Sequence, residues 1–380
     1  MMRFMALPIV LLAFVSVSPL WCETSSSPQT WTFAVSGDSR NCGDVIMPAI
    51  AQRAKAENVR FYWHLGDLRA IYNIDEDMQK LAEVRKQPFT ILSYEQAAWD
   101  DFIQHQIVPF GEVPFFLGIG NHETIPPKSR DQFVTQFADW LDAKPIHDQR
   151  LLDQPDSSGN QPQQVGDHRV RTYYHWIING VDFINLDNAS EEQFDFAQVQ
   201  WFKKVINQDA ANPDLRTVVV GMHAALPESF SRDHSMNDWS GHEWYQGEAS
   251  GKDVYTSLVN FKNNAHKAVY VLSSHSHFFM DDLYDTEYWR GQHAVLPGWI
   301  VGTAGAQQYP LPTDARPTWK DHTYGFLLGT AHRDGNIEFR FVELDREKDI
   351  PQEIKDRYTK KFVDWCYDNN RKAAGQPHGH

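Results

Sequence analysis

Side chains that bind divalent metal ions follow each of five strand-like segments of this sequence. In chain order the motifs are Gly37-Asp38-Ser39-Arg40, Gly66-Asp67-Leu68-Arg69, Gly120-Asn121-His122-Glu123, His223 and His275-Ser276-His277. Carboxylate, amide and imidazole donors together suit transition ions of intermediate hardness such as Mn, Fe, Zn or Co. Two such ions that share a carboxylate, with a hydroxide between them, form a clamp for hydrolysing phosphate esters.

Each of these signals is ordinary on its own. A Gly-Asp step is usually a turn, and a lone histidine after an apolar strand, such as His223, is usually structural. His275 and His277 carry more weight, because residues two apart on an extended chain point the same way. The glycines before Asp38 and Asp67 would let the backbone turn sharply, so that the next side chain reaches an ion. The succession of all five motifs at strand ends is what predicts one metal site.

Short β-rich segments alternate with segments of helical periodicity along most of the chain. The β-rich segments begin near Thr30, Val59, Val113, Arg216, Lys267 and Pro297, and the helical ones near Val45, Tyr94 and Phe196. This alternation predicts βα units in a layered α/β domain. In such sheets the loops after the strands converge on one crevice, and all five motifs lie in those loops.

Two turn pairs predict hairpins that interrupt the alternation. Asn179-Gly180 and Asp334-Gly335 tolerate the positive φ of a tight two-residue connection between antiparallel strands. We therefore expect mixed sheets, two of them packed together. Near the end of the chain, apolar residues at helical spacing predict one docked amphipathic helix followed by a frayed tail: Ile354, Tyr358, Phe362 and Trp365.

The composition is that of a globular protein without a broad cationic surface. Of the 380 residues, 42% are hydrophobic, which is enough to bury a sizeable core. The 50 acidic and 35 basic residues give a formal net charge of -15. Extended nucleic acid and anionic lipid are therefore not expected partners, whereas a small phosphorylated substrate is.

The N-terminus has the pattern of an export signal. Arg3 precedes the apolar segment Phe4 to Val17, which is too short to span a bilayer comfortably. We expect a signal peptide and leader over residues 1–27, cleavage between Ser18 and Ser27, and a secreted or periplasmic protein without a stable membrane span; an uncleaved anchor is the alternative. Cys42 and Cys366 could pair in an oxidising compartment, although the sequence does not determine their pairing.

The order of the motifs resembles the calcineurin-like metallophosphoesterase superfamily, which includes the purple acid phosphatases. The superfamily pattern runs Asp-x-His, Gly-Asp, Gly-Asn-His-Asp/Glu, His and Gly-His-x-His, and the resemblance covers about Trp31 to Leu344, with GIGNHE as its most specific part. It implies a four-layer α/β/β/α sandwich of two mixed β-sheets flanked by helices. It also implies hydrolysis of phosphate esters, by a phosphatase or phosphodiesterase, through a metal-activated hydroxide and one or two divalent ions.

The same resemblance implies a role for each motif residue. Asp67 resembles the carboxylate that bridges both ions. The other ligands would be Asp38 and His277 at the first metal position, and Asn121, His223 and His275 at the second. His122 resembles the residue beside the bound phosphate, which stabilises its charge and can protonate the leaving oxygen. Glu123 would orient His122.

Arg40 departs from the superfamily pattern. It stands where a histidine usually binds metal, and a protonated guanidinium is a poor ligand. We hypothesise that Arg40 holds the phosphate by bidentate hydrogen bonds while the first metal position is weak or empty. The alternative is that Arg40 turns outward or forms a salt bridge with a nearby acidic residue, and that Tyr72 or water completes an ordinary metal pair. Ala70 occupies the position of the purple acid phosphatase tyrosine, and Ser274 replaces the glycine of Gly-His-x-His.

We expect one catalytic domain over residues 28–346, with insertions at about 126–171 and 227–251, and a C-terminal helix and tail over 347–380. The remaining histidines, including His64, His175, His234 and His242, are expected to be structural or on the surface, although the last two lie in a loop that could overhang the site. Arg40 leaves open a second function: a secreted phosphate-binding or interaction protein on the same fold without turnover. The sequence does not determine the substrate, which depends on the inserted loops.

Overall fold

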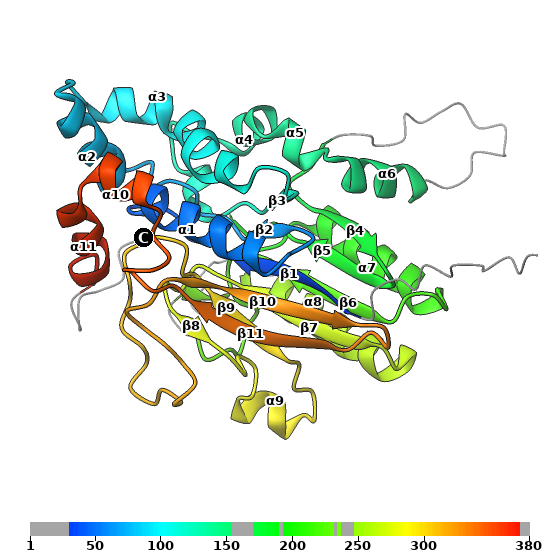
Figure 1. Ribbon diagram of the computed structural model, residues 1–380. Coiled ribbons are helices and arrows are strands. Elements are labelled where there is room, and N and C mark those ends of the chain that lie inside the picture. Colours follow the sequence, from blue (N-terminus) through cyan, green and yellow to red (C-terminus); the bar gives the residue numbers. More distant parts are fainter. Residues whose placement is uncertain (1–29, 154–169, 190–192, 232–233, 237–246, 373–380) are drawn as a thin grey trace, which may run out of the picture.

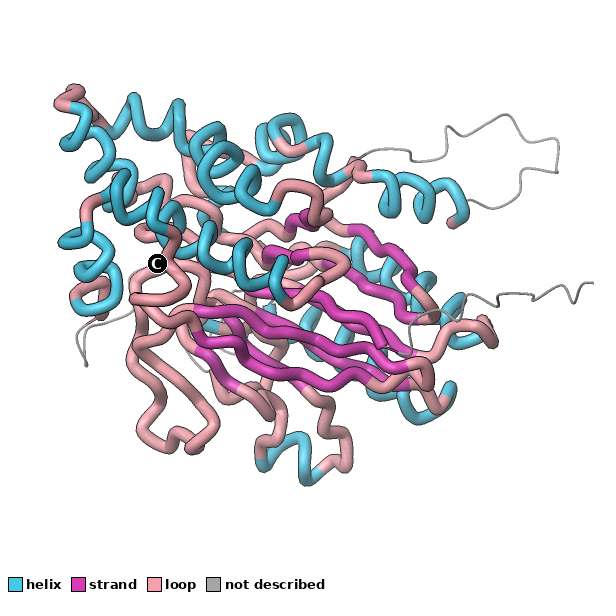
Figure 2. The backbone as a smooth tube through the Cα atoms, in the orientation of Figure 1, coloured by secondary structure: helices cyan, strands magenta, loops and turns pink. Residues whose placement is uncertain are grey.

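The computed structural model describes residues 30–153, 170–189, 193–231, 234–236 and 247–372. Two mixed β-sheets lie together in the middle of this part of the chain, with helices outside them (Figures 1 and 2). The fold class expected from the sequence is confirmed. Among the described residues, no helix is long and apolar enough to cross a membrane.

The first sheet has the strand order β11-β10-β1-β2-β3. Its strands are β1 Thr30–Ser36, β2 Tyr62–His64, β3 Phe115–Leu117, β10 Gly325–His332 and β11 Ile337–Glu343. β1, β2 and β3 run parallel, whereas β10 pairs antiparallel with both β1 and β11. The parallel strands thus bring the loops after Ser36, His64 and Leu117 to one edge.

The second sheet has the strand order β4-β5-β6-β7-β9-β8. Its strands are β4 Tyr174–Ile178, β5 Val181–Asn185, β6 Thr217–Gly221, β7 Ala268–Ser273, β8 Phe279–Met280 and β9 Gly298–Val301. β5, β6, β7 and β9 run parallel, and the two edge strands are antiparallel. The motifs that carry His223 and His275 follow β6 and β7.

Helices cover the outer faces of both sheets. They are α1 Gly43–Ala56, α2 Glu76–Arg85, α3 Ile91–Phe102, α4 Arg130–Gln136, α5 Ala138–Leu141, α6 Lys144–Leu152, α7 Phe196–Ala211, α8 Gly247–Ala265, α9 Glu287–Gly291, α10 Gln352–Tyr358 and α11 Lys360–Asp368. Alternate residues of β6 face the two sides of their sheet: Val219 belongs to the core between the sheets, and Val218 to the outer core that α7 and α8 share. Within the predicted insertion at about 126–171, Lys144–Leu152 form α6, and residues 154–169 lie outside the described residues.

Aromatic side chains fill the space between the two sheets. Phe61, which precedes β2, stacks on Phe33 of β1, with ring centroids 5.3 Å apart. It also meets Phe183 of β5 edge-on at 5.0 Å. Trp176 of β4 stacks on Phe116 of β3 at 4.1 Å. Such offset and edge-on contacts add to the stabilisation that burial of the rings provides. The two sheets, and therefore their loops, are held in a fixed relation.

The C-terminal helix and the second hairpin differ from what the sequence predicts. The C-terminal helix is two helices, α10 and α11, because Thr359 between them has φ 69° and ψ 144°. The second hairpin is longer than predicted: Asn179 and Gly180 both have positive φ, but at Asp334-Gly335 only the glycine does. Its strands end at His332 and begin again at Ile337. Cys42 and Cys366 form a disulfide, with Cα atoms 6.0 Å apart.

His175 is structural, as expected, and it is ionised. Its Nδ1 lies 2.7 Å from Asp182 Oδ2 and its Nε2 lies 2.8 Å from Asp153 Oδ2. Burial lowers the pKa of His175, but the charges of Asp182 and Asp153 outweigh burial and raise it to about 10. The histidine thus joins the end of α6 to the β4–β5 hairpin through two charge-assisted hydrogen bonds.

We expect His175→Asn to lower the free energy of unfolding by about 3 kcal/mol at pH 6, because it leaves buried carboxylates without their cation. A raised histidine pKa stabilises the fold fully below the unfolded value of about 6.5, and this stabilisation is lost as the pH rises through the folded value. The difference between wild type and variant should therefore shrink from pH 6 to pH 10. Urea unfolding measures it, with the exposed His293→Asn as control. A difference that is independent of pH would contradict this assignment.

Candidate metal centre

Four of the predicted ligands form one buried cluster. Asp38, Asp67, His223 and His275 each offer a ligand atom, and these atoms all lie within 4.8 Å of one another. Every one of these side chains is buried. The structure therefore brings together residues from the ends of β1, β2, β6 and β7, and Asn121 joins them through its contact with His223.

The backbone of the ligand loops is left-handed at the ligands themselves. Asp38 and Asp67 have φ 60° and His275 has φ 65°, a region that non-glycine residues seldom adopt. The first two loops are also tied together, because the N–H of Asp38 donates to the carbonyl of Gly66 at 3.0 Å. Before Asp67 the expected sharp turn includes the glycine, since Gly66 has φ 96°, whereas in the first loop Asp38 itself takes the positive φ. The glycines permit close approach: a Cβ at Gly120 would lie 2.2 Å from Asp67 Oδ1.

Side-chain nitrogen and oxygen atoms converge around His223. His223 Nδ1 faces the carbonyl oxygen of Leu65 at 3.0 Å, which can only accept a hydrogen bond. In the neutral ring Nε2 then carries a lone pair, and it faces Asn121 Oδ1 at 3.0 Å and Asp67 Oδ1 at 3.3 Å. Three converging acceptors are the donor set of a divalent cation, so the residues fit a metal ion.

The charges of the cluster agree with a cation site. Burial lowers the pKa of His223, but the Asp67 carboxylate outweighs burial and raises it to about 9, so without a metal ion Nε2 also carries a hydrogen, which a bound cation would replace. Burial raises the pKa of Asp67, and the neighbouring His122, His223 and Arg40 more than reverse this, so that the pKa lies well below its ordinary value. Burial raises the pKa of Asp38, but the neighbouring His277 outweighs burial and lowers it. Two buried carboxylates in one site favour cations.

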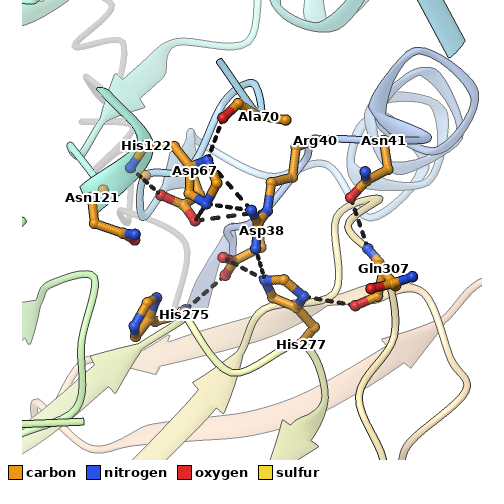
Figure 3. Close-up of polar contacts among 12 residues, drawn as sticks. Asp38, Arg40, Asn41, Asp67, Ala70, Asn121, His122, His275, His277 and Gln307 are labelled. Carbon is orange, nitrogen blue, oxygen red and sulfur yellow. Dashed lines mark hydrogen bonds and ion pairs between the residues drawn. The ribbon is translucent and has the colours of Figure 1, made fainter. Parts of the chain in front are cut away.

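Arg40 points into the site and not outward (Figure 3). Its Nη1 contacts His122 Nε2, and its Nη2 lies 3.1 Å from His277 Nε2. Its Nε lies 3.9 Å from Asp67 Oδ2, and only 7% of the residue is exposed. Arg40 therefore does not turn outward, but it does form the salt bridge with a nearby acidic residue that the alternative included. Tyr72 lies beside His122, with ring centroids 5.2 Å apart, and its side chain is about half exposed.

His122 and Glu123 stabilise different parts of the site. His122 Nδ1 lies 2.6 Å from the carbonyl oxygen of Ala70, which fixes the ring, and burial together with Arg40 lowers its pKa to about 3. The Glu123 carboxylate accepts from the backbone N–H groups of Gly120, Asp67 and Leu68 at 2.8 to 2.9 Å. The prediction that Glu123 orients His122 is wrong: Ala70 does so, and Glu123 holds the loop of Asp67.

Two aromatic residues beside the ligands were not identified from the sequence as part of the site. The Tyr309 ring stacks on His277, with centroids 4.1 Å apart, and on His234 at 5.1 Å. His234 in turn meets His275 edge-on at 4.8 Å, so this residue of the predicted overhanging loop does reach the site. No motif marks Tyr309, because stacking requires only a flat ring. His242 lies outside the described residues.

A buried charge cluster fixes the motif loops from behind. Arg69, the last residue of the second motif, is fully buried and contacts the carboxylates of Asp44 and Asp101, with Asp77 at 3.0 Å. Asp75 accepts from the backbone N–H of Asn41 at 2.6 Å. The residue that follows Arg40 is thus tied to this cluster, which positions the loops and does not reach the ligands.

Comparison with known proteins agrees with this geometry. The family model for calcineurin-like phosphoesterases matches residues 32–279. No curated protein matches the chain in sequence. With the family, the buried aspartates and histidines point to a centre of the two-metal type.

Several solved structures are similar to this chain at low sequence identity. A purple acid phosphatase from yellow lupin (Lupinus luteus) seeds is 15% identical over 83% of this chain and 51% of its own, with TM-score 0.48, so this chain spans about half of the lupin enzyme. A dimetal phosphatase from Danio rerio is 12% identical over 83% and 99%, with TM-score 0.49. GAP50, the anchor in the inner membrane complex of Plasmodium, is 13% identical over 92% and 99%, with TM-score 0.47. The family match over residues 32–279, most of the chain, shows that this protein belongs to the calcineurin-like phosphoesterases.

Proposed function

We propose that this protein is a secreted hydrolase of small phosphate esters, with Asp67, Asn121, His223 and His275 as ligands of a divalent ion. The observation that carries the proposal is the convergence of His223 Nε2 on Asn121 Oδ1 at 3.0 Å and on Asp67 Oδ1 at 3.3 Å. When bound, a divalent ion there would supply positive charge to the phosphoryl group and lower the pKa of water.

The chain's own residues supply the rest of the phosphate site. Arg40 brings a fixed positive charge beside Asp67 Oδ2, whereas His223 faces Asp67 Oδ1, and the planar N–H fork of Arg40 binds phosphoryl oxygens well. His122 holds Arg40 through its Nε2, so that the guanidinium is oriented before substrate arrives. Together they can stabilise negative charge on a transferring phosphoryl group.

Two observations support export of the protein. The apolar segment 4–17, which lies outside the described residues, has the pattern of a signal peptide. The buried Cys42–Cys366 disulfide is of a kind that persists in oxidising compartments. Detection of a mature chain lacking residues before about 28 in the medium or periplasm would test this part of the proposal.

We expect the protein, after removal of metal and reconstitution with Mn or Zn, to hydrolyse a chromogenic phosphomonoester or phosphodiester, and chelator-treated protein to be inactive. Initial rates across a panel of metals and esters measure this and rank the substrates. An absence of hydrolysis with every metal would favour the alternative function, a phosphate-binding or interaction protein without turnover.

A further inference from the structure

The guanidinium of Arg40 occupies the place where a second cation would bind. We infer that Arg40 replaces one of the two metal ions of this type of centre, so that the chain tightly binds a single divalent ion and grips phosphate with a built-in cation. The part of this inference that concerns phosphate rests on the proposed function. The number of metal ions bound per chain does not depend on it. The surrounding hydrogen bonds, charges and backbone each support it.

The hydrogen bonds of two histidines show that their lone pairs are directed at Arg40. His122 Nδ1 faces the carbonyl oxygen of Ala70 at 2.6 Å, and His277 Nδ1 faces that of Gln307 at 2.7 Å. A carbonyl only accepts, so both rings carry their hydrogen on Nδ1. Each Nε2 then has a lone pair, and these atoms face Nη1 and Nη2 of Arg40 (Figure 3). The guanidinium thus uses the imidazole donor that the first metal would need.

The carboxylates of the first metal position are also balanced by Arg40. Asp67 Oδ2 lies 3.9 Å from Arg40 Nε, and Asp38 Oδ1 lies 3.3 Å from His277 Nε2. One guanidinium and one divalent ion already exceed the charge of these two carboxylates. A second divalent ion among Asp38, Asp67 and His277 would lie in a buried site beside a cation that cannot lose its proton. Arg40 therefore opposes binding at the first position and leaves the second, around His223, intact.

The backbone around Arg40 is held on several sides. The N–H of Asn41 donates to Asp75 Oδ1 at 2.6 Å, and its side-chain amide donates to Glu76 at 2.8 Å. The N–H of Cys42 contacts the carbonyl of Gly305 at 3.1 Å, and the Cys42 side chain is bonded to Cys366. Withdrawal of Arg40 to admit a metal would require this loop to break several contacts. The inward position of Arg40 is therefore part of the fold.

Arg40 keeps N–H groups for a ligand. A guanidinium has five N–H donors, and the two histidines use one on each terminal nitrogen. Within the described residues, Nε makes no hydrogen bond although it is buried. Donors left over in a buried cationic site suit the oxygens of a phosphate group. Unlike a metal ion, this grip cannot be removed by a chelator.

The test counts bound metal and uses three proteins: wild type, Arg40→His and Arg40→Lys. Arg40→His restores the superfamily ligand, whereas Arg40→Lys keeps the positive charge without offering a lone pair. After reconstitution with Mn or Zn and gel filtration, elemental analysis should give one ion per chain for wild type and Arg40→Lys, and two for Arg40→His. Two ions in the wild type, or one in a folded Arg40→His protein, would overturn the inference. If Arg40→His does not fold, the wild-type count alone decides.

A second measurement addresses phosphate without metal. Calorimetric titration of chelator-treated protein with inorganic phosphate should show binding to wild type that is about tenfold tighter than to Arg40→His, because a charge-assisted hydrogen-bonding group is lost. Equal affinities would overturn the assignment of Arg40 to phosphate. If the protein does not hydrolyse phosphate esters, the metal count and the phosphate titration can still be interpreted, because neither depends on substrate turnover.

Discussion

Asp67→Asn should abolish hydrolysis and remove most of the bound metal, while the fold is retained. Asp67 is fully buried, its Oδ1 lies 3.3 Å from His223 Nε2, and its Oδ2 lies 3.6 Å from His122 Nε2. Asparagine keeps the shape and can still accept from the backbone N–H of His122, which Asp67 Oδ1 does at 3.1 Å. It lacks the negative charge and the second anionic oxygen, so affinity for a divalent ion should fall by at least about a hundredfold.

Metal content after gel filtration and initial rates of ester hydrolysis measure this effect together. Asp214→Asn, which changes an exposed aspartate, is the matched control and should behave as wild type. Asp67→Ala should lose metal as well, with some loss of stability because the hydrogen bond to the His122 backbone disappears. An Asp67→Asn protein with ordinary metal content and ordinary rate would refute the site.

His122→Ala should lower turnover by about a hundredfold or more and leave the metal content nearly unchanged. The ring contacts Arg40 through Nε2, and its Nδ1 is held by Ala70. It is therefore bound to the cation that we assign to phosphate, and its removal frees the guanidinium to turn. The ligand atoms around His223 do not depend on it.

The control for this prediction is His293→Ala, which removes an exposed imidazole. Turnover under saturating ester and metal content by elemental analysis are the two readouts. Loss of metal in proportion to activity would make His122 a ligand instead. A large fall in turnover with little change in metal content would show that His122 acts on the phosphate and not as a metal ligand.

The layered fold and the family could be predicted because their signals are local. Five of the parallel strands, β1, β2, β3, β6 and β7, are followed by a ligand motif, and Asn179-Gly180 marks a hairpin by its own conformational preference. The C-terminal break could not be predicted in this way. Ile354, Tyr358 and Phe362 are all buried on the two helices, so the apolar spacing continues across the turn at Thr359 and hides it.

The direction of Arg40 could not be predicted because its partners are distant in the sequence. His122 and His277 lie 82 and 237 positions away, and their lone pairs are directed by the carbonyls of Ala70 and Gln307. Every residue has a backbone carbonyl, so the sequence does not indicate which carbonyls accept these hydrogen bonds. The role of Glu123 could not be predicted for a related reason. Its partners are backbone N–H groups, which every residue except proline offers.

The Cys42–Cys366 disulfide determines when the site is completed during synthesis. Its two cysteines are 324 residues apart in the chain. At about 5 to 20 residues per second, the ribosome needs roughly 16 to 65 s to reach the second after the first. Cys42 therefore cannot pair with Cys366 during that interval. The loop of Arg40 leaves the ribosome first among the motif loops, and it is covalently fixed last, when α11 docks.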